Sequence, residues 1–262
     1  MKNLIFFDID GTLVPEGENE ISQDVINVIK QLNEQDENEV FICTGRCYHQ
    51  AKKIIFSLGL TNYITSNGQE VQRGEKLIYN CNFSHEEASA LIDYVEGKKC
   101  AWAYETRTNI NIPEKPFGEK LKEILMSYGF KDIIISDNAI KEGIFQLWIF
   151  EQPEKIDGIL AGIGKKNKFY KWSDECAEIL PGNESKGNGI RKVVEFLKAQ
   201  GTKEIKTFAF GDGVNDVEMF EYCDVAIVMG NAKDSVKKHA DFITTSCEED
   251  GIKKGLTKYN LI

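Results

Sequence analysis

The sequence predicts an α/β fold in which a parallel sheet flanked by helices is split by an inserted α+β domain with a mainly antiparallel sheet. Short continuous apolar runs, typical of buried parallel strands, alternate with helix-like segments near both ends of the 262-residue chain. The middle of the chain carries paired strand-like segments, which favour antiparallel pairing. These two patterns divide the chain into an outer domain and an insertion.

The first 82 residues alternate regularly between the two kinds of element. Leu4–Phe7 is a short apolar run, and Ser22 is a suitable N-cap before apolar residues at helical spacing. The predicted elements are a strand at 4–7, a helix at 22–32, a strand at 40–46, a helix at 51–58 and a strand at 63–68.

Residues 83–184 are predicted to form the inserted domain. Ser84 and Glu87 make a capping-box pattern at its first helix, before apolar residues from Ala88 to Val95. The elements expected after this helix are strands at 100–104 and 108–112, a helix at 117–128 stopped by Gly129, a strand at 144–150, a helix at 153–164, and strands at 167–172 and 176–180.

The alternation of helices and buried strands returns at Ser185. A helix is expected at 187–199, and buried strands at 207–210 and 224–228. Residues 1–82 and 185–262 are therefore predicted to form one domain, interrupted by the insertion.

Polar residues follow the predicted parallel strands, where ligands of open α/β sheets bind. Asp8 and Asp10 follow the first strand, and Asp212 and Asp216 follow the strand at 207–210. Two carboxylates ~4 Å apart repel by about 4 kcal/mol at an effective dielectric near 20, so a proton or a cation must offset them. Mg²⁺ is favoured because it binds a few carboxylates and keeps sites for waters or substrate oxygens.

Two further strand ends carry residues of the same kind. Thr44, Gly45 and Arg46 follow the second strand, and Asn67 with Gly68 follows the third. Any one of these groups alone is most simply a turn or a helix cap. Arg46 is equally consistent with a structural ion pair and with a substrate contact.

Four segments together resemble the motifs of the haloacid dehalogenase-like hydrolases, in that family's order. They are DIDGTL (8–13), TGR (44–46), SKGNGI (185–190) and GDGVNDVEM (211–219). MGNAKDSVKKHADFIT (229–244) and EEDGI (248–252) are further similar to the Cof-type phosphatase branch. The resemblance implies a Rossmann-like core at 1–82 and 185–262, and a large α/β cap at 83–184.

The resemblance also implies catalytic roles. Asp8 is the expected nucleophile that becomes an aspartyl-phosphate, and Asp10 is the expected general acid and base. Lys186 is expected to compensate the charge of Asp8 and of the bound phosphate. Without the resemblance, a Lys at a helix start is most often a solvated surface residue.

The same resemblance implies the binding residues. Mg²⁺ is expected on Asp8, on the backbone carbonyl of Asp10, on Asp212 and, less directly, on Asp216. The phosphate-binding residues are expected to be Ile9 and Gly45 through their backbone amides, Thr44, Lys186 and Asn215.

The expected function is Mg²⁺-dependent hydrolysis of small phosphorylated metabolites, with sugar phosphates the leading class. A phosphomutase and a phosphatase of sucrose- or phosphoglycerate-linked sugars remain alternatives on the same core. A non-catalytic phosphate-binding signalling module is a more remote alternative, because such modules lack the second Asp that Asp10 supplies. The inserted domain is expected to read the leaving group, with candidates Trp102, Tyr104, Arg107, Asn109, Trp148 and Trp172.

Composition restricts the partners and the compartment. The formal net charge of −10 repels nucleic acid and anionic membrane, so neither is an expected partner, and a monomer or homodimer is expected. The seven cysteines form no CxxC pair and have three histidines for company, which argues against zinc and for reduced thiols in the cytoplasm.

Overall fold

The chain forms two compact units in a computed structural model, which describes residues 1–15, 17–18, 20–114, 117–127, 130, 133–135, 143–163 and 166–262. Unit 1 contains Met1–Arg46, Gln50–Asn80 and Ser185–Ile262, and unit 2 contains Cys47–His49 and Cys81–Glu184. The roles of catalytic core and substrate-reading cap, which the sequence assigns to similar ranges, remain predictions.

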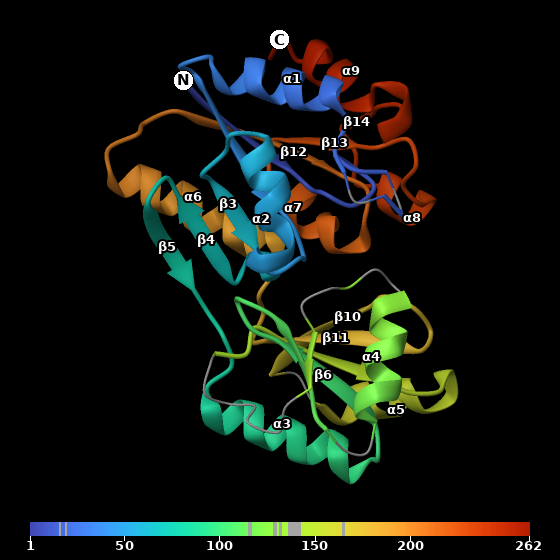
Figure 1. Cartoon of the computed structure of the whole chain (residues 1–262). Coiled ribbons are helices and arrows are strands. Elements are labelled where there is room, and N and C mark those ends of the chain that lie inside the picture. Colours follow the sequence, from blue (N-terminus) through green and yellow to red (C-terminus); the bar gives the residue numbers. More distant parts are fainter. Residues whose placement is uncertain are drawn as a thin grey trace. The chain divides into compact units, whose positions relative to one another are not determined.

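Unit 1 is built on a sheet of strand order β14-β13-β12-β1-β2-β3-β4-β5 (Figure 1). The strands from β14 to β3 pair in parallel, and β3, β4 and β5 pair antiparallel. The strands are β1 (Lys2–Phe7), β2 (Asn38–Cys43), β3 (Tyr63–Thr65), β4 (Glu70–Arg73), β5 (Lys76–Asn80), β12 (Ile205–Gly211), β13 (Val225–Val228) and β14 (Phe242–Ile243).

Helices cover both faces of this sheet (Figure 1). One face packs against α6 and α7 through a core that includes Phe6, Phe41 and Val193. Helices α1, α2 and α9 lie on the other side. The helices are α1 (Gln23–Asn33), α2 (Tyr48–Ser57), α6 (Lys186–Ala199), α7 (Val217–Tyr222), α8 (Asp234–Lys237) and α9 (Gly251–Lys258), with short 3-10 turns η1 (Ser66–Gly68), η2 (Val214–Asp216) and η3 (Cys247–Glu249).

Local sequence explains where several of these elements begin. The Ser22 hydroxyl accepts a hydrogen bond from the Val25 amide at 3.3 Å, as the predicted N-cap requires. Ser185 caps α6 in the same way through the Asn188 amide. The predicted strand at 63–68 is shorter than expected, because Ser66, Asn67 and Gly68 all have positive φ and leave the extended conformation.

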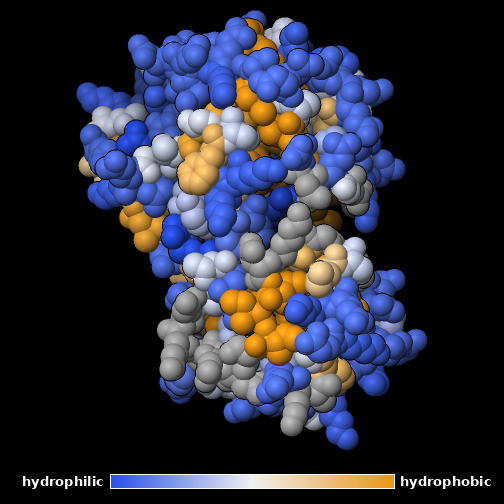
Figure 2. All heavy atoms as spheres, viewed as in Figure 1, coloured by the Kyte–Doolittle hydropathy of each residue, from blue (hydrophilic) through white to orange (hydrophobic). Residues whose placement is uncertain are grey.

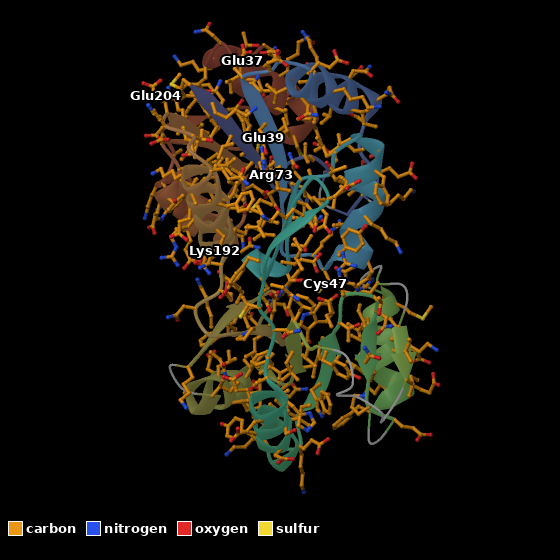
Figure 3. The ribbon with its side chains drawn as sticks, turned by 90° about the vertical axis from the view of Figure 1, so that its left-hand side faces the viewer. Glu37, Glu39, Cys47, Arg73, Lys192 and Glu204 are labelled. Atoms are coloured by element: carbon orange, nitrogen blue, oxygen red, sulfur yellow. The ribbon has the colours of Figure 1, made fainter. Side chains whose placement is uncertain are left out.

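The hairpin of β4 and β5 was not among the predicted elements. It turns at Gly74, whose φ is +57°. The Arg73 guanidinium at the end of β4 donates to the Glu39 carboxylate at 2.5 Å (Figure 3), which ties the hairpin to β2 near the amino ends of the parallel strands. Much of β5 is exposed or half-buried, so its sequence lacks the strong apolar signal of the central strands.

Unit 2 has a second sheet, with strand order β10-β11-β9-β6-β7-β8. It is antiparallel except for the parallel pair β7 and β8. Its elements are α3 (His85–Gly97), β6 (Ala101–Glu105), β7 (Ile110–Ile112), α4 (Gly118–Ser127), β8 (Ile133–Ile135), β9 (Gln146–Phe150), α5 (Pro153–Ile163), β10 (Asn167–Lys171) and β11 (Cys176–Pro181).

Two apolar cores stabilise unit 2. Residues of α3 and α5 pack on one face of the sheet, and residues of α4 pack on the other. The predicted capping box is present, with Ser84 accepting from the Glu87 amide and Glu87 accepting from the Ser84 amide. Tyr128 and Gly129, predicted to end α4, and position 164 lie outside the described residues.

The cysteines are reduced, and the face of the molecule in Figure 2 is largely hydrophilic. All seven cysteines are free thiols. Hydrophilic residues cover much of the face in Figure 2, with apolar residues gathered in separate clusters. Among the residues that the structure describes, no helix has both the length and the apolar character needed to cross a membrane.

Candidate active site

The carboxyl ends of the parallel strands in unit 1 bring the motif residues together. Lys186, the first residue of α6, is fully buried, and its ammonium donates to Asp8 Oδ1 at 2.6 Å and to Asp216 Oδ1 at 2.5 Å. A buried Lys is stable only when its charge is compensated, and here two buried carboxylates compensate it. The surface interpretation of Lys186 is therefore wrong for this fold.

Asp216 fixes the turn that follows β12. Its Oδ2 accepts from the amides of Asp212 and Gly213 at 2.9 and 2.8 Å, while its Oδ1 accepts from Lys186. Both oxygens are thus already hydrogen-bonded within the protein. Asp216 is better placed to hold the loop and Lys186 than to be a principal metal ligand.

Asp212 lies against the loop after β1. Its Oδ1 accepts from the Thr12 hydroxyl at 3.0 Å, and its Oδ2 accepts from the Asn231 amide at 3.2 Å. Gly11 has φ +75°, and a Cβ there would come within 2.2 Å of Asp212 Oδ2. Glycine at position 11 is therefore needed both for the turn and for the approach of this carboxylate.

The acidic cluster contains more carboxylates than compensating cationic groups. Ligand oxygens of Asp8, Asp212 and Asp216 can all lie within 4.8 Å of one another. Burial first, and then the neighbouring Asp216, raise the pKa of Asp8 well above its usual value and raise the pKa of Asp212 to about 7. Burial by itself lowers the pKa of Lys186, but Asp216 and Asp8 outweigh it and raise that pKa, so the ammonium stays charged.

A divalent cation matches this donor set. Three carboxylates and one ammonium leave a formal charge of −2 in a largely buried space. Hard oxygen donors at an excess of negative charge are the ligands that Mg²⁺ prefers. Asp8 accepts one hydrogen bond and Asp212 one at each oxygen, whereas Asp216 accepts three, so Asp8 and Asp212 have most capacity to hold such an ion.

Asp10 lies apart from the buried cluster, and its side chain is about half exposed (56%). The Arg46 guanidinium holds it in a bidentate pair, in which Nε donates to Oδ2 at 2.9 Å and Nη2 donates to Oδ1. The structural ion pair, one of the two interpretations that the sequence left open for Arg46, is therefore present. It fixes the direction of the Asp10 carboxylate without burying it.

The predicted phosphate-binding residues come from three strand ends. Thr44 is fully buried, and its hydroxyl accepts from the Arg46 amide at 3.2 Å. Asn215 donates to Asn67 Oδ1 at 3.0 Å, and a Cβ at Gly45 would come within 3.3 Å of both asparagine side chains. The backbone of Gly45 therefore lies beside Asn67 and Asn215. Ile9 is fully buried, and its carbonyl accepts from the amides of the following turn.

Two neighbours of the site, Thr12 and Asn231, were not identified from the sequence, and Asn67 was identified only as a polar residue at a strand end. Thr12, Asn67 and Asn231 contact Asp212 or Asn215 through hydrogen bonds that span up to 200 residues. Thr12 and Asn231 lie inside segments that carried the family resemblance, and that was the one available signal. Spacing along the chain cannot show which Asn reaches which carboxylate.

The candidate leaving-group residues, all in unit 2, differ in their burial and contacts. Trp102, Tyr104 and Trp148 are buried in its apolar cores. Trp172 is 55% exposed, and its Nε1 donates to Glu178 Oε2 at 2.8 Å. Arg107 is exposed and stacks 4.3 Å from the centre of the Tyr48 ring. The Asn109 Oδ1 and backbone carbonyl accept within the turn after β6, from Thr106 and Asn111.

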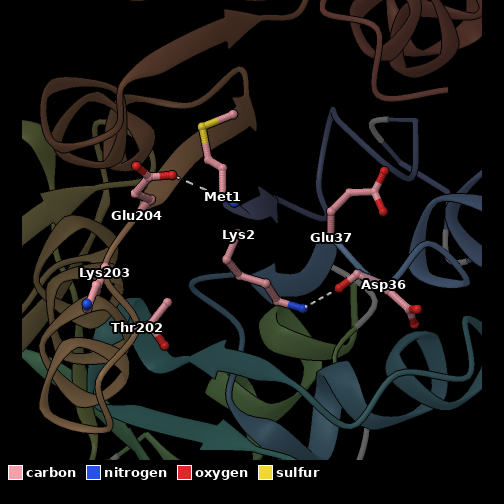
Figure 4. Close-up of a pocket in the computed structure, with 7 residues that line it drawn as sticks. All are labelled: Met1, Lys2, Asp36, Glu37, Thr202, Lys203 and Glu204. Atoms are coloured by element: carbon pink, nitrogen blue, oxygen red, sulfur yellow. Dashed lines mark hydrogen bonds and ion pairs between the residues drawn. The ribbon is translucent and has the colours of Figure 1, made fainter.

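A cavity in unit 1 lies away from the motif residues. Met1, Lys2, Asp36, Glu37, Thr202, Lys203 and Glu204 line about 470 Å³ near the amino ends of β1, β2 and β12 (Figure 4). It is open to solvent and contains none of the motif residues. Two contacts join its lining residues, from Lys2 to the Asp36 carbonyl at 2.9 Å and between the Met1 ammonium and Glu204 at 3.9 Å.

Comparisons with known proteins identify the family of the chain. The family model described as haloacid dehalogenase-like hydrolase matches residues 5–256. The chain is 32% identical to YkrA of Bacillus subtilis (strain 168), which is named a phosphatase only provisionally, over 99% of this chain and 98% of that one. It is 25% identical to YitU of the same organism, a 5-amino-6-(5-phospho-D-ribitylamino)uracil phosphatase, over 98% and 97% of the two chains.

Solved structures share the fold. The subclass IIB sugar phosphatase BT4131 of the haloacid dehalogenase superfamily superimposes with a TM-score of 0.81 and 27% identity over 100% of both chains. The predicted fold class, a parallel α/β sheet together with a second, mainly antiparallel sheet, is therefore confirmed. The chain belongs to the haloacid dehalogenase-like hydrolases, and among them to the phosphatases.

Proposed function

We propose that this phosphatase hydrolyses small phosphorylated metabolites, sugar phosphates first among them, with Mg²⁺ and through an aspartyl-phosphate on Asp8. The observation that carries the proposal is the buried Asp8–Lys186–Asp216 arrangement, with the carboxylate of Asp10, two residues after Asp8, held by Arg46. Mg²⁺ held by Asp8, Asp212 and the Asp10 carbonyl would supply charge neutralisation for the phosphoryl oxygens.

The chain's own residues account for the two chemical steps. An Asp8 oxygen attacks phosphorus, the bond to the leaving oxygen breaks, and Asp10 gives that oxygen a proton. Asp10 then takes a proton from water, and that water attacks the aspartyl-phosphate to release inorganic phosphate and free Asp8. Lys186, at 2.6 Å from Asp8 Oδ1, favours the ionised form of the nucleophile and orients it.

The test is phosphate release from a panel of esters with and without Mg²⁺. The panel should contain hexose and pentose phosphates, a generic aryl phosphate and 5-amino-6-(5-phospho-D-ribitylamino)uracil, the substrate in the name of a relative. Quenched turnover mixtures should also yield a peptide containing Asp8 with the mass of one added phosphoryl group. Hydrolysis that survives exhaustive chelation, or label on another residue, would contradict the proposal.

Substrate discrimination is assigned in this proposal to unit 2. Trp172 supports the assignment, because a large apolar ring with more than half its surface exposed is suited to stacking on a sugar. Trp172→Ala is expected to change the ratio of kcat/KM for two natural esters, while the rate with an aryl phosphate changes little. Phe169→Ala is a matched control, because Phe169 is 42% exposed on the neighbouring strand β10. An unchanged ratio in the Trp172 variant would remove this residue from the proposal.

A further inference from the structure

Asn231, in the loop after β13, connects three segments at the acidic cluster. Its Nδ2 donates to the Gly11 carbonyl at 2.8 Å and to Asp212 Oδ2 at 3.2 Å. Its Oδ1 accepts from the Cys247 amide at 3.2 Å. One side-chain amide thus links the loop after β1, the loop after β12 and the turn η3.

The orientation of this amide is determined by its partners. A backbone N–H can only donate and a backbone carbonyl can only accept, so the atom facing Cys247 is the oxygen and the atom facing Gly11 is the nitrogen. The nitrogen must therefore also face Asp212. A donor is directed at Asp212 Oδ2 whichever way the rest of the network is arranged.

The loop that carries Asn231 is itself held at two points. The Met229 amide donates to the Gly211 carbonyl at 3.0 Å, and the Gly230 amide donates to the Thr245 carbonyl at 3.0 Å. A Cβ at Gly230 would come within 2.8 Å of the Ser246 amide nitrogen, so this approach requires glycine. The side chain of Asn231 therefore projects from a fixed backbone.

We propose that Asn231 is a positioning residue for the divalent cation, holding the Asp212 carboxylate and the Asp10–Gly11 backbone in the arrangement that the cation needs. The inference rests on the proposed function, since it assumes a cation at Asp8 and Asp212. Asp212 is held from both sides, by Thr12 at Oδ1 and by Asn231 at Oδ2. The Gly11 amide is bonded to the Val14 carbonyl at 2.8 Å, so Asn231 completes the fixation of the backbone next to Asp10.

A purely structural role would have a different signature. Loss of a loop contact lowers thermal stability equally with and without metal, whereas loss of a positioning contact weakens the metal affinity itself. Groups that orient metal ligands typically contribute about 10–100-fold to metal affinity. The two roles are therefore separable by measuring Mg²⁺ affinity on the intact chain.

The experiment titrates MgCl₂ against the thermal midpoint of the wild type, Asn231→Ala and Asn62→Ala after removal of metal with EDTA. Asn62 is the matched control, because its amide also joins two backbone segments, Val40 and Gly74, away from the acidic cluster. We expect Asn231→Ala to need about 10–100-fold more Mg²⁺ for its stabilisation, and Asn62→Ala to need the wild-type amount. The kcat of Asn231→Ala at saturating Mg²⁺ should return toward that of the wild type, with an increased half-saturating Mg²⁺ concentration.

The possible outcomes distinguish a failure of the role of Asn231 from a failure of the proposed metal site. An unchanged Mg²⁺ requirement in Asn231→Ala, or in Asn231→Ser if the alanine variant does not fold, would overturn the role of Asn231 alone. A wild type with no Mg²⁺-dependent stabilisation would overturn the proposed metal site, and with it this inference. An equal increase in the Mg²⁺ concentration that Asn62→Ala needs for stabilisation would show a general loop effect, and would also overturn the inference.

Discussion

The two edges of the sheet in unit 1 use charge in opposite ways. At the amino edge, the ion pairs keep at least one partner in reach of solvent, as in the contact of the Met1 ammonium with Glu204 at 3.9 Å and in the pair of the buried Glu39 with the half-buried Arg73. At the carboxyl edge, Lys186 and Asp216 are fully buried and Asp8 nearly so, with an uncompensated negative charge. Exposed ion pairs contribute about 0–1 kcal/mol, whereas buried charges are costly unless they are paired. The free-energy cost of buried charge is therefore concentrated at the carboxyl edge of the sheet, where a bound ligand can offset it.

The largest expected effect is on turnover by Asp8→Asn. Asn has no anionic oxygen to attack phosphorus, so kcat should fall by on the order of 10⁴-fold or more, as for other nucleophile removals. Steady-state phosphate release by the purified variant is the measurement, and Glu204→Gln at the amino edge is the control that should keep full activity. Turnover near the wild-type rate would show that the buried carboxylate is not the nucleophile.

Lys186→Met tests whether the carboxyl edge depends on its buried cation. Removal of one partner from a buried ion pair costs about 3–5 kcal/mol, because the remaining charges lose their compensation. Thermal or denaturant unfolding at pH 8 should show this loss, together with a loss of activity. The loss should be smaller at pH 5, where protons can neutralise the carboxylates.

Lys2→Met at the amino edge is the matched variant for this measurement. Lys2 is half-buried and its ammonium lies 3.9 Å from Glu39 near solvent, so its removal should cost about 0–1 kcal/mol, the usual contribution of such a pair. Similar losses for the two lysine variants would remove the distinction between the edges.

Asp10→Ala is expected to slow turnover by roughly 10²–10⁴-fold, the usual contribution of general acid–base catalysis. The loss should be greatest for poor leaving groups, since an aryl oxide leaves with little protonation. Because its second step still needs a base, the aryl ester should show a burst of product followed by slow turnover. Identical bursts in the variant and the wild type would count against this role of Asp10.

The smallest expected effect is on the pH dependence of stability. The pKa of Asp212 is raised from its ordinary 3.8 to about 7, so the folded state binds more protons than the unfolded state between these values. Stability in EDTA should therefore decrease as the pH rises from about 4 to about 7. Asp212→Asn mimics the protonated acid and should have the higher Tm at pH 8 in EDTA, by about 2–4 °C for each kcal/mol recovered.

Mg²⁺ should reverse this order at pH 8, because it stabilises the wild type and binds the Asn variant weakly. Thermal scans at pH 5 and pH 8, with EDTA or with Mg²⁺, provide the comparison. A wild type whose Tm in EDTA is independent of pH from 4 to 8 would show that the carboxyl edge carries no uncompensated charge.

Much of unit 1 could be predicted because its central strands are continuous apolar runs that end in motif residues. The same sequence signal was absent from β5, where every residue is exposed or half-buried. In unit 2, Trp102, Tyr104 and Trp148 could not be separated from Trp172 by sequence, because core aromatics and exposed aromatics look alike along the chain. Burial depends on which helix covers each face of the sheet.

The site itself was predictable as a set of residues and less so as a set of contacts. Asp8, Lys186, Asp212 and Asp216 follow from the motifs, and the structure brings them together. That Asp216 uses both oxygens on Lys186 and backbone amides could not be predicted, because the turn geometry after β12 determines it. The same is true of the amide of Asn67 facing Asn215.

The central position of β1 in its sheet has a consequence for biosynthesis. One side of β1 pairs with β2, which the ribosome makes soon afterwards, but the other side must wait for β12. Thr12 and Asp212 are 200 residues apart, so at about 5–20 residues per second the delay is roughly 10–40 s. During that interval an apolar strand has an open edge, the kind of surface on which nascent chains aggregate. The order of synthesis therefore leaves the nucleophile-bearing strand incompletely paired until β12 has been made, an interval in which chaperones can act.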